Sequence, residues 1–236
     1  MKLGIMQPYF IPYIGYFQLM NYVDKYVVYD DVNFIKGGWI NRNRILSNNN
    51  EEIQLFNIRM SGASSTKLIN EIGVQNDEIY INKLLKTIKS TYKNAPYFTD
   101  TYEIIEEILK CKEGNLGKYI FNSIKVLSQK LNIKTEIILS SELKKDNSLK
   151  ASQKVMHICN ILSADTYVNS IGGKELYSYD EFRKNNITLE FLKTREIKYE
   201  QNNSDFKSNL SIIDVLMFNS PSEIKKFLDD FDIIKE

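Results

Sequence analysis

The chain has 236 residues, a formal net charge of +1 and an apolar fraction of 43%, enough for one sizeable α/β domain with a real core. A near-neutral charge, with a pI of about 7.6, provides no general basic field of the kind that duplex nucleic acid attracts. The apolar runs are far shorter than the roughly 20 residues of a transmembrane helix, and the N-terminus reads as a strand rather than a signal peptide. We therefore expect a cytoplasmic protein without a membrane span.

The opening residues predict a strand, a proline-containing loop, a helix and a second strand. Lys2 to Met6 is a short apolar run, and Tyr26 to Tyr29 is a second run rich in valine and tyrosine. Between them, residues 15–22 carry apolar side chains at helical spacing, while Pro8 and Pro12 keep the preceding loop out of the helix. This order has the length of a right-handed βαβ unit, in which ligands bind at the carboxyl ends of the strands.

The rest of the chain alternates strands and helices, apart from a helical stretch at about 77–131 that we interpret as an insertion. That stretch contains three predicted helices, at 79–92, 97–109 and 116–131. Further strands are expected at 52–58, 135–139, 166–169 and 188–192, and further helices at 151–162, 179–184, 211–219 and 221–231. The pattern predicts one α/β domain over residues 1–236, with a mostly parallel, Rossmann-like sheet.

The first candidate binding site is the loop after the first strand. It carries Gln7, Tyr9 and Tyr13, and a helix beginning at Gly15 would offer free backbone N–H groups to a phosphate. The competing interpretation is that the tyrosines are half-buried core residues, which is common for this residue type.

A second constellation follows the second predicted strand. Asp30 and Asp31 could hold Mg²⁺, orient an amine or act as a base, although aspartate is also frequent where strands end. Lys36 is a weaker catalytic candidate. A predicted loop then combines a stacking aromatic ring with amide and guanidinium donors suited to phosphate or carboxylate, unless it is simply a charge-paired surface loop: Trp39, Asn41, Arg42, Asn43 and Arg44.

A third candidate loop lies late in the chain, at another strand end. Its glycines permit close approach of a ligand to the backbone, or form a plain tight turn, and its members are Asn169, Gly172, Gly173, Glu175 and Tyr177. The sole histidine, His157, and the two cysteines, Cys111 and Cys159, lie in helical patterns and are expected to be structural. A Ser-His-Asp hydrolase and a histidine-ligated zinc site therefore lack material, and we assign no metal ligand from these residues.

The order of strand, loop, helix and strand resembles the start of nucleotidyltransferase-like α/β folds, which include pantothenate synthetase and the cytidylyltransferases. In those enzymes an H-x-G-H signature binds nucleotide phosphates. Here the matching tetrad is Tyr13-Ile14-Gly15-Tyr16, with tyrosines in place of both histidines. Because tyrosine carries no positive charge, ordinary nucleotidyl transfer is in doubt.

Several motifs together resemble the WbqC-like family: IMQPYF-x-PYIGYFQL, DKYVVYDDV, KGGWINRNRI, YVNSIGGKELY and LSIIDVLMFN. The resemblance spans essentially the whole chain. It implies a cytosolic protein encoded among genes for bacterial O-antigen and other surface polysaccharides, and a glycine transferase role has been proposed for family members. The candidate binding and catalytic residues named above, apart from Gly15 and Arg44, fall on positions that match the family motifs, and the resemblance implies functional roles for them.

The leading functional hypothesis is an enzyme that forms an amide between glycine, or a similar small acyl group, and an amino or acidic sugar that is linked to a nucleotide. ATP and Mg²⁺ are candidate cofactors, and the donor could instead arrive activated, as a thioester or an aminoacyl-tRNA. Two alternatives stay open: a non-catalytic accessory protein that binds a sugar nucleotide or glycan precursor, and a nucleotidyl- or glycosyltransferase with a metal site at Asp30 and Asp31.

Overall fold

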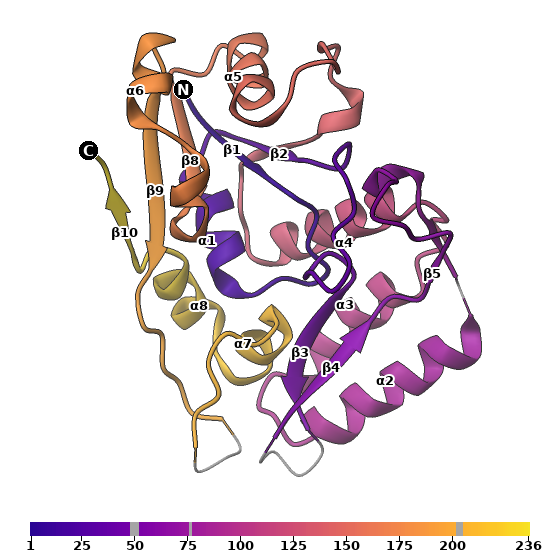
Figure 1. The fold of residues 1–236 in the computed structure, drawn as a ribbon. Coiled ribbons are helices and arrows are strands. Elements are labelled where there is room, and N and C mark those ends of the chain that lie inside the picture. Colours follow the sequence, from indigo (N-terminus) through magenta and orange to yellow (C-terminus); the bar gives the residue numbers. More distant parts are fainter. Residues whose placement is uncertain (48–51, 76, 202–204) are drawn as a thin grey trace.

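The computed structural model describes residues 1–47, 52–75, 77–201 and 205–236. Its centre is a six-stranded sheet in which neighbouring strands pair in parallel, except that β10 runs antiparallel to β9 (Figure 1). In spatial order the strands are β10 (Phe231–Ile234), β9 (Thr188–Thr194), β8 (Thr166–Ser170), β1 (Lys2–Met6), β2 (Lys25–Val28) and β7 (Glu136–Leu139). The expectation of an α/β fold with a mostly parallel sheet is confirmed.

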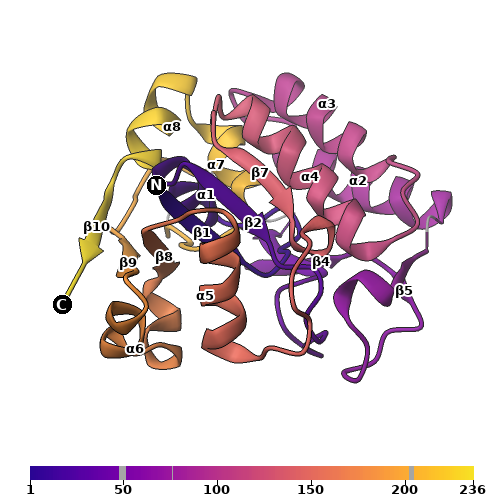
Figure 2. The ribbon, with the colours of Figure 1, turned by 90° about the horizontal axis from the view of Figure 1, so that it is seen from above.

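Helices cover both faces of this sheet, as Figure 2 shows. One face carries α1 (Ile14–Tyr22), α7 (Ile212–Phe218) and α8 (Pro221–Leu228), and the other carries α5 (Ala151–Ile161) and α6 (Tyr179–Lys184). Successive strand residues point to opposite faces, so Tyr26 and Val28 join one core cluster while Val27 joins the other. Burial on both faces explains why the central strands read as continuous apolar runs.

Between β2 and β7 the chain forms two hairpins and then three helices. The hairpins pair β3 (Arg42–Leu46) with β4 (Ile53–Asn57), and β5 (Met60–Ser61) with β6 (Gly73–Val74). The helices α2 (Glu78–Tyr92), α3 (Phe98–Leu109) and α4 (Leu116–Lys130) lie where the periodicity predicts them. In the described part of the chain, no helix is both long and apolar enough to cross a bilayer.

Three predictions from the sequence were wrong in detail. The segment from Trp39 to Arg44 was predicted to be a loop, but its last residues belong to strand β3. Asn43 and Ile45 are buried and alternate with Arg42 and Arg44, so a buried amide stands where an apolar residue would have indicated a strand. The predicted last helix ends at Leu228, and residues 231–234 form β10 instead. The glycine loop at 172–173 lies inside a 3₁₀ helix, η3 (Ile171–Leu176). Shorter 3₁₀ turns occur at η1 (Ile69–Glu71) and η2 (Ser140–Glu142).

The strand order creates a crevice at one edge of the sheet. From β1 the chain adds β2 and β7 on one side, and then β8 and β9 on the other. The connections that leave the carboxyl ends of β1 and β8 therefore diverge, and such a switch point is where open α/β sheets bind ligands.

A strained turn shapes the loop that leaves β1. Ile11 is fully buried and has a φ of 42°, which is uncommon for a β-branched residue. Its carbonyl oxygen accepts hydrogen bonds from Asn43 Nδ2 at 2.6 Å and from Ser211 Oγ at 2.7 Å. The backbone N–H of Ile212 donates to the carbonyl of Pro12 at 2.8 Å. Segments far apart in the sequence thus clamp the loop in one conformation.

The clamp is anchored by a buried carboxylate on α7. Asp214 accepts hydrogen bonds from the hydroxyls of Tyr92 and Tyr199, at 2.8 and 2.6 Å, and from Gln201 Nε2 at 2.7 Å. Burial raises the pKa of the Asp214 carboxyl, while the hydrogen bonds from Tyr199, Tyr92 and Gln201 act to lower it. Tyr92 comes from α2, so this cluster ties the helical region to the sheet domain.

Replacing Asn43 with alanine should lower the free energy of unfolding by about 2–4 kcal/mol, because it removes a fully buried amide from the strained turn. Urea denaturation of the two proteins measures the difference. The matched control is Asn41→Ala, which removes a single 3.3 Å bond to the carbonyl of Ile58 and should cost about 1 kcal/mol or less. Equal losses in the two variants would contradict the clamp.

Replacing Asp214 with asparagine should also cost about 2–4 kcal/mol, because the amide nitrogen cannot accept the hydrogen bonds that the second carboxylate oxygen accepts. The control is Asp180→Asn, which breaks an exposed ion pair with Arg183 on α6 and should change stability by less than about 1 kcal/mol. Thermal unfolding of both variants at neutral pH makes the comparison, and a stable Asp214→Asn protein would refute the anchoring role.

Candidate functional site

A cavity of about 530 Å³ lies at the switch point, beyond the carboxyl ends of β1 and β8. Its walls come from the end of β1 and the clamped loop, from α1, from the segment before β3, and from η3. The lining residues are Ile5, Met6, Gln7, Pro8, Tyr9, Tyr13, Gly15, Tyr16, Leu19, Tyr29, Ile35, Gly38, Trp39, Ile40, Asn169, Ser170, Gly172, Gly173, Leu176 and Tyr177.

Aromatic rings form much of the cavity wall. The ring centroid of Tyr9 lies 6.2 Å from those of Tyr13, Tyr16 and Trp39. Burial raises the pKa of Tyr9; the neighbouring Tyr13 raises it further, and the positive charge of Arg44 offsets part of the increase. Burial also raises the pKa of Tyr13 and of Tyr16. The phenols therefore stay neutral at physiological pH and act as hydrogen-bond groups and stacking surfaces, not as bases.

Gln7 and the start of α1 contribute polar groups to the same space. Within the described chain the Gln7 side chain forms no hydrogen bond, and Gln7 lines the cavity at the end of β1. The first turn of α1 has no capping side chain, and its residues Tyr13, Gly15 and Tyr16 are cavity residues. A Cβ atom on Gly15 would lie 2.4 Å from the Tyr13 ring and 2.6 Å from Thr194 Oγ1, so glycine permits the close packing there.

The rim of the cavity is apolar and exposed. Ile35, Trp39 and Leu176 are 52%, 41% and 72% exposed, which is unusual for three large apolar side chains around one opening. The guanidinium groups of Arg42 and Arg44 lie 5.4 and 5.1 Å from the centre of the Trp39 ring. Arg42 also donates to the carbonyls of Gly37 and Gly38, in the segment that carries Trp39, and neither arginine lines the cavity.

Charged side chains are missing from the described lining, which contains no Asp, Glu, Lys, Arg or His. Asp30 follows β2 but is 1% exposed, and its oxygens accept hydrogen bonds from the backbone N–H and the hydroxyl of Ser141, at 2.9 and 2.6 Å. Its contacts tie the end of β2 to the end of β7.

Asp31 belongs to a buried cluster with two lysines. Its Oδ2 atom lies 2.8 Å from Lys145 Nζ and 3.4 Å from Lys154 Nζ. Burial raises the pKa of the Asp31 carboxyl, but the hydrogen bond from Lys145, the neighbouring Ser140 side chain and the positive charges of Lys145 and Lys154 outweigh this effect, and the net pKa is lowered. Both ammonium groups lie at the same carboxylate oxygen, Asp31 Oδ2. Within the described residues, no group of three or more His, Cys, Asp or Glu side chains could hold a metal ion.

The structure gathers part of the sequence-predicted set around the cavity. The candidates that line it are Gln7, Tyr9, Tyr13, Gly15, Trp39, Asn169, Gly172, Gly173 and Tyr177. Asn43 and Asn169 have buried side chains whose amides bond to protein groups. The candidates outside the lining are Asp30, Asp31, Lys36, Asn41, Arg42, Asn43, Arg44 and Glu175.

Sequence reasoning missed several residues at or near this site. Tyr29, which lines the cavity, directly follows β2, and its place at a strand end was a usable signal. Leu176 and Ile35 had no signal, because single apolar residues in loops are common. Lys154 stands four residues before the fully buried Ile158, so a lysine on the buried stripe of a helix was the available clue.

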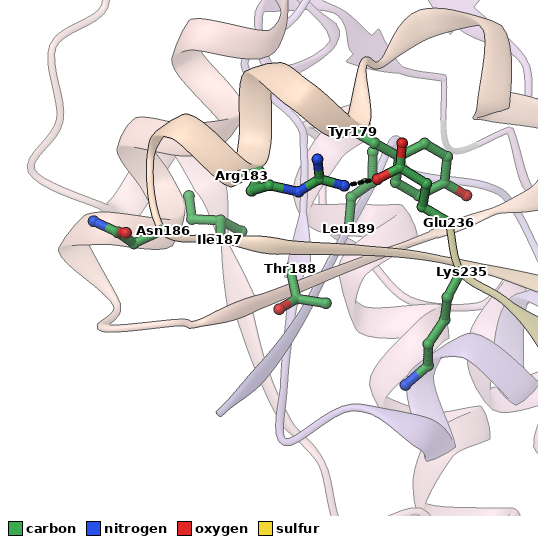
Figure 3. A pocket seen from close by; sticks show the side chains of 8 residues that line it. All are labelled: Tyr179, Arg183, Asn186, Ile187, Thr188, Leu189, Lys235 and Glu236. Atoms are coloured by element: carbon green, nitrogen blue, oxygen red, sulfur yellow. Dashed lines mark ion pairs between the residues drawn. The ribbon is translucent and has the colours of Figure 1, made fainter.

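A second cavity, of about 490 Å³, lies between α6, the start of β9 and the last residues of the chain (Figure 3). Arg183 and Glu236 form an ion pair across it, and Lys235 and Asn186 add further polar groups. None of its residues belongs to the candidate motifs, and it lies away from the switch point. We therefore assign the functional site to the cavity at β1 and β8.

The lowered pKa of Asp31 predicts a pH-dependent contribution to stability. A carboxyl whose pKa is lower in the folded state stabilises the fold above its ordinary value of 3.8, and this stabilisation is lost as the pH falls through the folded-state value. Asp31→Asn should therefore be less stable than the wild type at pH 7, with a gap that narrows as the pH falls below the ordinary value of 3.8. Urea unfolding across this range measures the gap, and a gap independent of pH would contradict the ion pairs.

Comparison with known proteins gives a family and one relative. The WbqC-like protein family model matches residues 7–226. The chain is 23% identical over 229 residues to a protein of Mycobacterium tuberculosis, named "Uncharacterized protein Rv1507c", and the match covers 96% of this chain and 97% of that protein. No solved structure matches. Because the family model covers nearly the whole chain, this protein belongs to the WbqC-like family.

Proposed function

We propose that this protein binds a nucleotide-linked sugar in the cavity at β1 and β8 and transfers a small acyl group, such as glycine, to the sugar to form an amide. The observation that carries the proposal is the cavity itself: it stands at the switch point of the sheet, its walls are aromatic, and its described lining has no charged side chain. Family membership is compatible with a role in bacterial surface polysaccharide synthesis.

Three features of the cavity match parts of a sugar nucleotide. Tyr9 and Trp39 provide stacking surfaces for a base or a sugar ring. The uncapped start of α1 provides backbone N–H groups for phosphate, in the manner of a Rossmann-like or nucleotidyltransferase-like site. Gln7 supplies an unpaired amide for sugar hydroxyls or the edge of a base.

The chemistry that suits this lining is transfer from a donor that is already activated. The sugar amine attacks the carbonyl carbon of a thioester or of an aminoacyl-tRNA. The N–C bond forms, the bond to sulfur or to the ribose oxygen breaks, and the leaving group takes the proton that the amine loses. An acyl adenylate made from ATP with Mg²⁺ would serve in the same way. The cavity then contributes mainly by holding the two reactants in register.

A second candidate is a binding protein without catalytic activity. It is favoured by the lack of an acid or base among the described lining residues, since the tyrosines stay neutral. The nucleotidyl- and glycosyltransferase alternative would need Asp30 and Asp31 as metal ligands, and their carboxylates instead contact Ser141 and the two lysines.

Ligand binding can be followed through the sole tryptophan, because Trp39 lies on the cavity wall. We expect a nucleotide-linked sugar to change its fluorescence, and we expect Gln7→Ala to weaken binding about tenfold without loss of stability, the effect of one hydrogen bond. The control is Gln54→Ala in strand β4, away from the cavity, which should bind as the wild type does. A panel of sugar nucleotides that all fail to alter the emission would refute the proposal.

Turnover separates the enzyme from the binding protein. The ligand identified by fluorescence is incubated with glycyl-tRNA, with a glycyl thioester, or with glycine, ATP and Mg²⁺, and the products are examined by mass spectrometry. A glycyl mass increment on the sugar establishes transfer and names the donor. Tight binding with no increment from any donor selects the accessory protein.

A further inference from the structure

In the cluster of Asp31, Lys145 and Lys154, two lysines form ion pairs with one carboxylate. All three side chains are at least nine-tenths buried: Lys145 is 1%, Asp31 is 9% and Lys154 is 10% exposed. The other nearby carboxylate, Asp30, bonds to Ser141 and forms no ion pair with either lysine. Burying an ammonium group costs free energy, so stability alone does not explain a second buried lysine at the same carboxylate.

The two lysines are held very differently. Lys145 Nζ lies 2.8 Å from Asp31 Oδ2 and also donates to the carbonyl of Ser140, so it is a well-bonded partner. Lys154 Nζ lies 3.4 Å from both Asp31 Oδ2 and the Asp31 carbonyl, beyond the roughly 2.7–2.9 Å of a good charge-assisted bond. Asp31 would therefore keep its main partner if Lys154 turned away.

Lys154 also lies beside the cavity wall. Its Nζ atom is 5.5 Å from the centre of the Tyr29 ring, and Tyr29 lines the cavity at the end of β2. Lys154 belongs to the first turns of α5, which starts at the carboxyl edge of the sheet, where the cavity opens. A buried cation with weak bonds thus lies against a half-buried ring that lines an otherwise uncharged cavity.

We propose that Lys154 is the anion-binding residue of this cavity: its ammonium turns from Asp31, past Tyr29, to bind the phosphate of the ligand, while Lys145 keeps Asp31 neutralised. The inference deepens the proposed function and rests on it, because the phosphate is that of the nucleotide-linked sugar. It assigns a specificity role to a residue that does not line the cavity.

The test measures Trp39 fluorescence with uridine, UDP and inorganic pyrophosphate. Lys154→Met should weaken UDP and pyrophosphate binding about 10- to 100-fold, the effect of a charge-assisted hydrogen bond, and leave uridine binding within about twofold. The matched control is Lys150→Met, an exposed lysine at the start of the same helix, which should change none of the three affinities by more than about twofold. Lys154→Arg should restore most of the UDP affinity.

In a second variant we expect pyrophosphate affinity to change in the opposite direction. Asp31→Asn removes the anion that competes for Lys154, so pyrophosphate should bind several-fold more tightly at a temperature where this variant is folded. Unchanged or weaker pyrophosphate binding in Asp31→Asn, or equal effects of Lys154→Met and Lys150→Met, would overturn the role of Lys154 and leave the proposed function standing. A wild type that binds neither UDP nor pyrophosphate overturns the inference, and one that also ignores every sugar nucleotide overturns the proposed function.

Discussion

The site depends on one constraint, the left-handed turn at Ile11. A buried β-branched residue at a φ of 42° costs about 1–3 kcal/mol, so the loop holds this shape because other segments impose it. Asn43 and Ser211 bond to the Ile11 carbonyl, and Asn43 also accepts a hydrogen bond from the Tyr9 hydroxyl at 3.2 Å. The clamp therefore fixes a cavity ring directly. This explains why a hairpin strand and a C-terminal helix belong to the same architecture as the first loop, although neither supplies much of the cavity wall.

Sequence reasoning predicted which segments meet at the cavity better than it predicted the contacts of individual side chains. Regular periodicity was enough for the helices and for the central strands, because burial on one stripe or on both faces leaves a strong pattern. Periodicity failed at β3, because Arg42, Asn43 and Arg44 are polar and their side chains bond to other parts of the chain. It also failed at β10, a short edge strand directly after a helix. The roles of Asp31 and Asn43 were beyond reach for a related cause. A buried amide and an exposed one look alike in a sequence, and the lysines that bind Asp31 come from positions more than 110 residues away.

The protein has two buried carboxylates whose surroundings push their pKa values in opposite directions. Asp31 faces two ammonium groups, which lower its pKa, whereas Asp214 faces neutral donors and its pKa is raised by burial. The neutral donors of Asp214 are Tyr92 from α2 and the neighbouring residues Tyr199 and Gln201 from the segment after β9, so this carboxylate joins two distant segments to α7. Asp31 instead holds a lysine that its own charge does not require. The contrast is the reason to interpret one cluster as structural and the other as poised for a ligand.

An uncharged aromatic cavity with cations held outside it has a consequence for selectivity. Stacking on tyrosine and tryptophan discriminates weakly among rings, because each ring offers a similar face. Discrimination must then come from groups that act at fixed points: the Gln7 amide, the first turn of α1 and, in the proposed arrangement, the Lys154 ammonium. Phosphate can satisfy the last two of these, and a neutral sugar cannot. A nucleotide handle on the sugar would thus supply most of the recognition, while the sugar itself stays free to present its amine to an activated donor at the apolar rim.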